Sequence, residues 1–348
     1  MQLPGIQTTH AHDHKWERGY KAPAHARDFL KKCHQTRPWL TVLTALSDHA
    51  VILALAAGVY WAYLYLHPAF LLVLYPLAAI GIVRSMRGLE NLVHEGSHFN
   101  WSRSDHGLND LLCNLLAAVP VFSDVVRYRP GHKLHHFSFG TDEDADLGRY
   151  QVLAIEEISR RNPIAFAAGI VRRIVAYVIG WWKVIQTRPA VLGKSLLWHA
   201  VFLILPAALA LGLGTALALW LAFWIGPFLL LLPWHRFVAE AGKHQYEGQE
   251  TVFDATISNI GFVHHLLLHP HSDGYHLLHH LFPGIPHHQL ARAHRGLAQL
   301  DPGGYGEALR LRTHILEDPE PARRPKPAAT PPPAVLDPVE VEEEVLVG

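Results

Sequence analysis

The chain has 348 residues, of which 50% are hydrophobic and 17% are charged, and its mean hydropathy is positive. A water-soluble domain of this length is rarely so apolar, so the composition favours a membrane protein. The 30 basic residues are matched by 30 acidic ones, which gives no argument for a nucleic-acid partner. The two cysteines, Cys33 and Cys113, lie far apart and argue against a disulfide framework, an iron–sulfur cluster or a zinc finger.

The chain begins with a polar segment, residues 1–42, that lacks the apolar core of a signal peptide. We expect this segment to stay in the cytoplasm. Residues 43–66 are nearly all apolar and long enough to cross a bilayer, which takes about 20 residues at a rise of about 1.5 Å each. The chain then turns at His67-Pro68 and returns through residues 69–83, continuing as a helix toward His94.

A second apolar hairpin follows later, formed by residues 196–213 and 215–233. With the first hairpin it gives four membrane-spanning helices. Neither predicted outer turn, at His67-Pro68 and at residues 212–214, contains Lys or Arg, whereas the segments assigned to the inside carry nearly all of them. By the positive-inside rule, both termini lie in the cytoplasm, and we expect an integral protein of the bacterial inner membrane.

Two further apolar stretches are interpreted as lying at the membrane without crossing it. Residues 108–122 are short and interrupted by polar residues, which favours a re-entrant or surface helix. Residues 164–185 could span, but Arg172 and Arg173 in their middle favour an interfacial helix, because arginine is costly in the centre of a bilayer. The predicted fold is therefore an all-α integral membrane protein with four transmembrane helices, interfacial helices and a cytoplasmic cap.

The cap is expected to contain three histidine motifs. On a helix, residues at i, i+3 and i+4 share one face, so their imidazoles can converge on one point. Imidazole binds iron, copper, zinc and nickel, and eight such ligands are too many for one ion, which indicates two metals. The chain has 27 histidines, so one such motif could arise by chance, but three together argue for a metal site. The eight residues are His94, His98, His132, His135, His136, His276, His279 and His280.

The order HxxxH, HxxHH, HxxHH, with Leu-Phe-Pro-Gly-Ile-Pro after the last motif, resembles the histidine boxes of the membrane fatty acid desaturases and their hydroxylase relatives. The resemblance covers roughly residues 45–300. It implies two iron ions, Fe2+ or Fe3+, held by the eight histidines, with O2 as co-substrate and a lipid or acyl substrate. It also implies a separate electron donor, ferredoxin or similar with its reductase, since the sequence has no flavin, haem or iron–sulfur motif.

A ninth ligand is common in this family, as a histidine shortly after a glutamate. Here Ala241 follows Glu240, so His244 is the plausible substitute. Asn259, holding a metal through water, is the alternative. With the ligands assigned, residues 43–300 are expected to form the membrane di-iron domain. The Pro-rich and acidic residues 301–348 are expected to form a disordered tail.

Three functions remain open from the sequence. The first is a desaturase that introduces a double bond into an acyl chain, either a fatty acid or lipid-linked. The second is a hydroxylase or related oxygenase that inserts one oxygen into an unactivated C–H bond, including that of a secondary metabolite. The third is a metal transporter or sensor. A transport path should place ionisable residues along the spans, whereas the motifs flank them, which argues against the third.

Overall fold

The computed structural model describes residues 16–186 and 188–318, which are mostly helical. The helices are α1 (Arg27–Cys33), α2 (Pro38–Tyr65), α3 (Leu71–Ser97), α4 (His106–Cys113), α5 (Val125–Phe137), α6 (Ala145–Val152), α7 (Pro163–Gln186), α8 (Pro189–His199), α9 (Leu205–Leu211), α10 (Leu213–Trp220), α11 (Leu232–Glu240), α12 (Val252–Ala255), α13 (His276–Leu281) and α14 (His287–Leu300). Two short strands, β1 (Ile257–Asn259) and β2 (Arg310–Arg312), pair in parallel.

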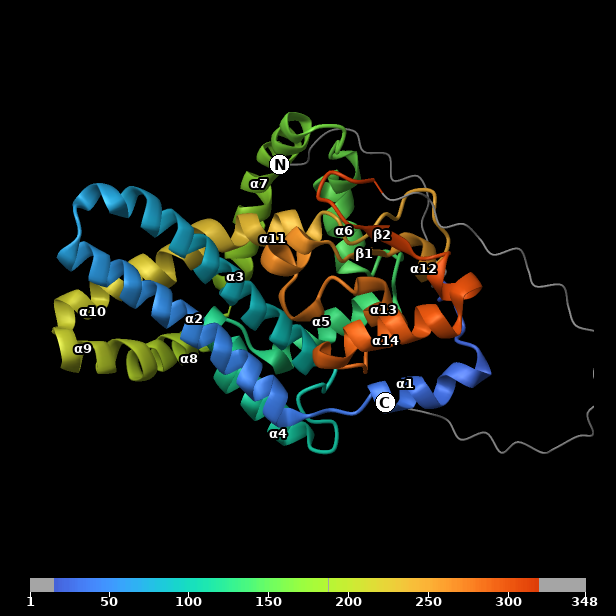
Figure 1. Cartoon of the computed structure of the whole chain (residues 1–348), viewed down its shortest axis with the longest axis horizontal. Coiled ribbons are helices and arrows are strands. Elements are labelled where there is room, and N and C mark those ends of the chain that lie inside the picture. The colour runs from blue at the N-terminus through green and yellow to red at the C-terminus, as the bar shows by residue number, and fades with distance from the viewer. Residues whose placement is uncertain (1–15, 187, 319–348) are drawn as a thin grey trace, which may run out of the picture.

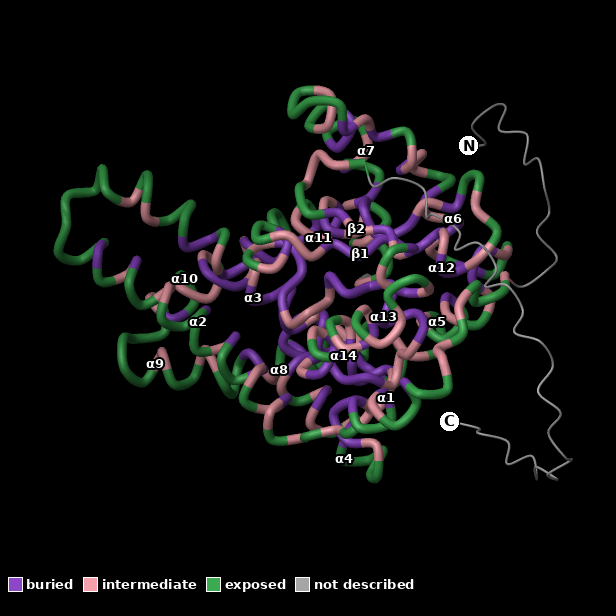
Figure 2. Tube along the Cα trace, turned by 45° about the vertical axis from the view of Figure 1, so that its right-hand side comes forward, coloured by how far each residue is buried: buried purple, intermediate pink, exposed green. Residues whose placement is uncertain are grey.

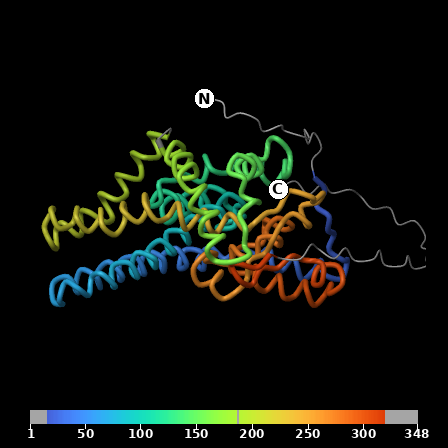
Figure 3. Tube along the Cα trace, turned by 90° about the horizontal axis from the view of Figure 1, so that it is seen from above, coloured from blue at the N-terminus to red at the C-terminus, as the bar shows by residue number. Residues whose placement is uncertain are grey.

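Two long hairpins extend from one end of the molecule. One is α2 with α3, and the other runs from α8 through α9 and α10 to α11, with π-helical turns joining the pieces (Figures 1 and 3). The far ends of both hairpins are exposed, whereas buried residues concentrate at the opposite end (Figure 2). Leu72 and Leu209 are 79% and 82% exposed at these ends. Such apolar exposure suits lipid and not water, so this is an integral membrane protein.

Within the described residues, five helices are long and apolar enough to cross a membrane: Pro38–Tyr65, Pro68–Ser97, Pro163–Ile185, Pro189–Leu211 and Leu213–Glu240. Four of them correspond to the predicted spans. The remaining one is the stretch that the sequence places at the interface. Its Arg173 donates from Nε to the carbonyl of Leu153 at 2.7 Å and is therefore tied to a loop of the cap. The bent pair formed by residues 106–121 and 125–137 is a further candidate if it is one span, so the count of four crossings stays a prediction.

The segment between the first and second histidine motifs is sharply bent. Residues 106–121 and 125–137 meet at 89°. At the bend Phe122 has a positive φ of 56°, and Asp124 caps the next helix by accepting from the backbone N–H of Val126 at 3.0 Å. This geometry fits the re-entrant segment expected for residues 108–122. It returns α5 to the end of the molecule where α3 finishes.

The end opposite the hairpins is a cap with its own core. In it α13 packs against α14, and α1 covers α14 (Figure 1). Leu277, Leu278 and Leu297 are fully buried there.

The cap also includes residues 301–318, which the sequence analysis assigns to a disordered tail. In particular β2 pairs with β1, and its alternate residues Arg310 and Arg312 donate hydrogen bonds to the carbonyls of Asp254 and Gly242. Residues 1–15 and 319–348, the rest of the predicted polar segment and tail, lie outside the described residues.

Candidate metal centre

The three histidine motifs lie on three helices that meet in the cap. The end of α3 carries the first motif, α5 the second and α13 the third, while His244 lies on the loop after α11. Within the described residues, the side chains form two groups whose nitrogens lie within 4.8 Å of one another. The first group is His94, His98, His132, His136 and His279; the second is His135, His244, His276 and His280. All nine predicted ligands are therefore brought together.

Consecutive histidines serve different groups. His135 and His136 follow one another on α5, yet His136 belongs to the first group and His135 to the second. His279 and His280 on α13 divide in the same way. Neighbouring residues on a helix point about 100° apart, so a His-His pair can supply two sites side by side. The HxxHH pattern thus places one imidazole in each of two adjacent histidine groups.

The distances within each group suit a coordinated ion. In the first group, His132 Nε2 lies 2.8 Å from His98 Nε2 and 3.1 Å from His136 Nε2. In the second, His276 Nε2 lies 3.0 Å from His244 Nε2 and 3.2 Å from His280 Nε2. Two nitrogens at about 2.1 Å from one ion and at right angles would lie about 3.0 Å apart. The nitrogens thus already have the spacing of neighbouring ligands.

Electrostatics also favour a cation at this position. Burial is the main cause that lowers the pKa of His244, His276, His279 and His280 well below the ordinary value, and neighbouring cationic or histidine side chains add to it. The four rings are therefore neutral at physiological pH. Neutral imidazole has a free lone pair and is the form that binds metals.

Comparison with known proteins identifies the family. The fatty acid desaturase family model matches residues 76–310, which is more than half of the chain. The chain belongs to the fatty acid desaturase family. It is also similar to the dihydrorhizobitoxine desaturase of Bradyrhizobium elkanii, with 28% identity over 313 residues that cover 82% of this chain and 83% of the relative. The protein is accordingly an oxidoreductase of the desaturase and hydroxylase type, with histidine clusters compatible with a metal site.

In this desaturase-family protein a carboxylate orients one of the candidate ligands. Asp144 Oδ1 lies 2.8 Å from His135 Nδ1, which directs the Nε2 atom of His135 toward the second group. Asp144 is itself held in place, since it caps α6 by accepting from the N–H of Asp146 at 2.9 Å and accepts from the Tyr246 hydroxyl at 3.3 Å. Carboxylates in this position fix the tautomer and raise the basicity of a ligating histidine. Sequence reasoning missed Asp144.

A partly buried ion cluster lies beside the two groups, centred on Glu240. Its carboxylate accepts from Arg236 Nε at 2.8 Å, from Arg149 at 2.9 Å and from the Tyr177 hydroxyl at 3.1 Å. These partners come from α11, α6 and α7, so one acid ties three helices together. Glu240 thus has a structural role here, and His244 is the residue of this segment that joins a histidine group.

Asn259, the alternative ninth ligand, forms side-chain hydrogen bonds with its protein neighbours. Its Nδ2 donates to the carbonyl of Gly242 at 3.0 Å, and its Oδ1 accepts from Arg312 at 3.1 Å. Both amide atoms are therefore engaged in holding the loop that carries His244 against β2. This geometry favours His244 over Asn259.

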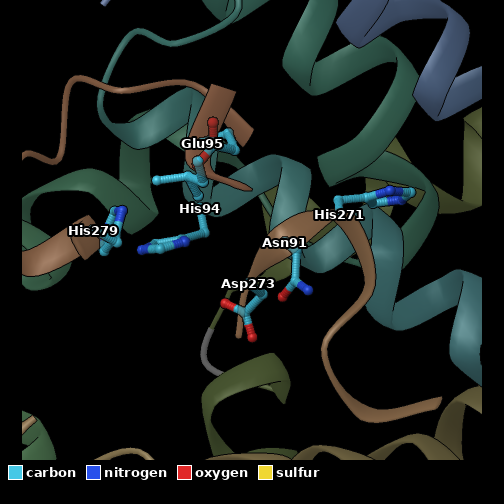
Figure 4. A pocket seen from close by; sticks show the side chains of 7 residues that line it. Asn91, His94, Glu95, His271, Asp273 and His279 are labelled. Carbon is cyan, nitrogen blue, oxygen red and sulfur yellow. The ribbon is translucent and has the colours of Figure 1, made fainter. Parts of the chain in front are cut away.

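A small cavity lies beside the first group. It is lined by Asn91, His94, Glu95, His271, Asp273, His279 and Leu290 (Figure 4). Its volume of about 10 Å³ is close to the room that one water molecule needs. The Glu95 side chain contacts the segment that follows the third motif, where its Oε2 accepts from the backbone N–H of His287 at 2.7 Å. Glu95 therefore connects the first and third motifs and does not join the ligand nitrogens.

Proposed function

We propose that the protein is an O2-dependent di-iron desaturase that introduces a double bond into an acyl chain, either a fatty acid or lipid-linked. The observation that carries this proposal is the division of nine histidines into two adjacent groups at one end of the apolar helices. We assign five histidines to one iron ion and four to the other. The donor set fits, because iron accepts imidazole ligands and the nine rings are held close together.

Two iron ions bound there would supply O2 activation and the removal of hydrogen from an unactivated C–H bond. The chain's own part is to hold the ligands, to orient them and to keep bulk water out. His276, His279 and His280 are each no more than 5% exposed, so the third motif is shielded from bulk water. Asp144 orients His135 from behind.

We propose that electrons come from another protein. Desaturation removes two hydrogens from the substrate, and reduction of O2 to two waters takes two further electrons and two protons. A ferredoxin or similar protein with its reductase is the proposed donor. We place the cap and both termini on the cytoplasmic side of a bacterial inner membrane, because the two predicted outer turns lack Lys and Arg. Such electron donors occur in the cytoplasm.

We keep one alternative reaction and one alternative substrate. A hydroxylase would use the same ligands and return oxygen to the substrate. The second outcome concerns the substrate: the similar protein from Bradyrhizobium elkanii is named for dihydrorhizobitoxine and not for a fatty acid. A secondary metabolite is therefore the alternative substrate of this chain.

The deciding experiment is mass spectrometry of a host that expresses the protein with a ferredoxin system. Lipids, free fatty acids and added dihydrorhizobitoxine are measured together, beside His279→Ala and His264→Ala variants. His264 is a buried histidine outside both groups, so it is the matched control. We expect a product that lacks two hydrogens with the native protein and the control, and none with His279→Ala.

The other results separate the alternatives. A product that gains one oxygen would establish a hydroxylase. Conversion of dihydrorhizobitoxine alone would establish the metabolite as substrate. Bound iron without O2 consumption in the purified, reduced protein would contradict the enzyme and favour a metal sensor or transporter.

A further inference from the structure

A second cavity, which none of the nine candidate ligands lines, lies where the N-terminal segment joins α2. It is open to solvent, has a volume of about 520 Å³ and is lined by His34, Gln35, Thr36, Arg37, Arg103 and Ser104. Residues 34–37 connect α1 to α2, and residues 103–104 belong to the loop that follows the first histidine motif. The lining contains two guanidinium groups and an imidazole but no carboxylate.

The Arg103 side chain is held rigidly at this cavity by neutral oxygen acceptors. It donates to Asn100 Oδ1 at 2.8 Å, to the carbonyl of His34 at 3.2 Å and to the carbonyl of Gly284. Gly284 permits the approach, since an added Cβ would lie 3.0 Å from the Arg103 guanidinium. Partial burial lowers the pKa of Arg103, with Glu95 as an opposing charge. Among the described residues Arg103 forms no ion pair, so this guanidinium lacks a direct counter-ion.

Arg37 adds a second cation to the same cavity. It immediately precedes Pro38, the first residue of α2, and it too forms no ion pair with any residue that the structure describes. The Trp39 side chain beside it is 59% exposed. Tryptophan and arginine at the start of a spanning helix are typical of the headgroup level of a bilayer. The cavity therefore lies where lipid phosphates are found.

We propose that this cavity binds a phosphate group. Guanidinium groups pair with phosphate through charge-assisted hydrogen bonds, and the hydroxyl and amide donors of Thr36, Ser104 and Gln35 line the same space. A phosphate here supplies the counter-ion that Arg103 lacks. Because Arg103 contacts Asn100 after the first motif and Gly284 after the third, the bound anion stabilises the join between these two loops. The phosphate belongs to an anionic lipid headgroup or to a small soluble phosphate.

The test measures binding to the full-length protein and does not depend on catalysis. Purified protein in phosphatidylcholine nanodiscs is titrated with phosphatidylglycerol, and protein in detergent is titrated with inorganic phosphate, with thermal unfolding and native mass spectrometry as readouts. The test variant is Arg37→Gln, because this exposed residue holds no other part of the fold. The matched control is Lys32→Gln, an exposed cation on α1 that does not line the cavity.

We expect saturable binding that Arg37→Gln weakens about fivefold, the equivalent of about 1 kcal/mol for one basic residue near an anionic headgroup, and that Lys32→Gln leaves unchanged. If inorganic phosphate does not displace bound phosphatidylglycerol, the result supports a lipid headgroup as the ligand. Saturable binding of phosphate alone supports a soluble ligand. Equal weakening by both variants, or binding that does not saturate with either probe, would overturn the proposal.

Discussion

His271 Nε2 lies 2.6 Å from Asp48 Oδ2, so a histidine of the cap is paired with an acid inside the first spanning helix. Asp48 is 1% exposed, and its other oxygen lies 3.3 Å from an Arg84 nitrogen. Gly88 makes room for the pair, since an added Cβ would lie 2.5 Å from Asp48 Oδ2. His271 has a positive φ of 57°, which is unfavourable for a residue with a side chain. The contact with Asp48 therefore anchors a strained turn just before the third histidine motif.

Replacing Asp48 by Asn should loosen that turn. The amide keeps the size of the side chain but removes the negative charge that both His271 and Arg84 face, so we expect a loss of about 1–3 kcal/mol in stability. Hydrogen exchange of residues 269–276 in the detergent-solubilised protein should rise. The control is Asp28→Asn on the exposed side of α1. Unchanged exchange in the Asp48 variant would mean that the turn is held by other contacts.

Removing His244 should empty one metal site and spare the other. We expect iron content to fall from about two ions to about one per chain, because four of the nine nitrogens, including that of His244, form the second group. Metal analysis of His244→Ala beside His264→Ala measures this. A full complement of iron in His244→Ala would show that the second site needs only three histidines.

Asp144→Asn should weaken metal binding without removing a ligand. The Asn side chain no longer presents a carboxylate to His135 Nδ1, and loss of such a partner typically costs about 10–100-fold in metal affinity. Iron retention during chelator titration gives the measurement. Asp142→Asn, an exposed neighbour, is the control, and equal retention in both variants would contradict the assigned role.

Glu240→Gln should destabilise the whole cap. The substitution removes the charge that Arg149 and Arg236 share, but these arginines keep Asp146 and Glu90 as partners and the pairs are only partly buried. We therefore expect a loss of about 1–3 kcal/mol. Denaturant or thermal unfolding should show the loss, with the exposed Glu247→Gln as control. If the two variants unfold alike, the cluster around Glu240 contributes little to stability.

The metal-free protein should lose stability as the pH falls from about 6.5 to about 4. Burial lowers the pKa of His269 to about 4, while a histidine in the unfolded chain titrates near about 6.5. Between these values the unfolded chain binds a proton that the folded protein does not, so acid favours unfolding, and above about pH 6.5 this contribution is constant.

Thermal unfolding of the native chain and of His269→Asn across this range checks the expected direction. The pH dependence should be shallower in the variant. An identical dependence would assign the effect to other groups.

The histidines were predictable because their signal is local. HxxxH and HxxHH spacings report helix faces directly, so the eight motif residues could be assigned before any tertiary contact was known. His244 was accessible only through the pattern of the family, since it lies on a loop. It joins its group through the long-range bridge between His244 and Thr256, which leaves no periodicity in the sequence.

Other features depended on contacts that sequence spacing does not encode. Asp144 follows His135 by nine residues, and the tight turn through Gly140, with φ 73°, brings its carboxylate back to that ring. The strand at Arg310–Arg312 was assigned to the tail because the Pro-rich composition that follows suggests disorder. Its partner β1 lies more than fifty residues earlier, and the pairing buries Arg310 and Arg312, residues that composition alone places on a surface.

The two adjacent His-His pairs have a mechanical consequence. Each pair links the two nitrogen groups through a single peptide unit, once on α5 and once on α13. The separation of the groups is therefore set by the pitch of two helices and not by loop conformation. A movement of either helix displaces one histidine of each group at once, so these helices cannot change the geometry of one group alone. The geometry of one group alone can change only through the histidines outside these two helices, which are His94 and His98 in the first group and His244 in the second.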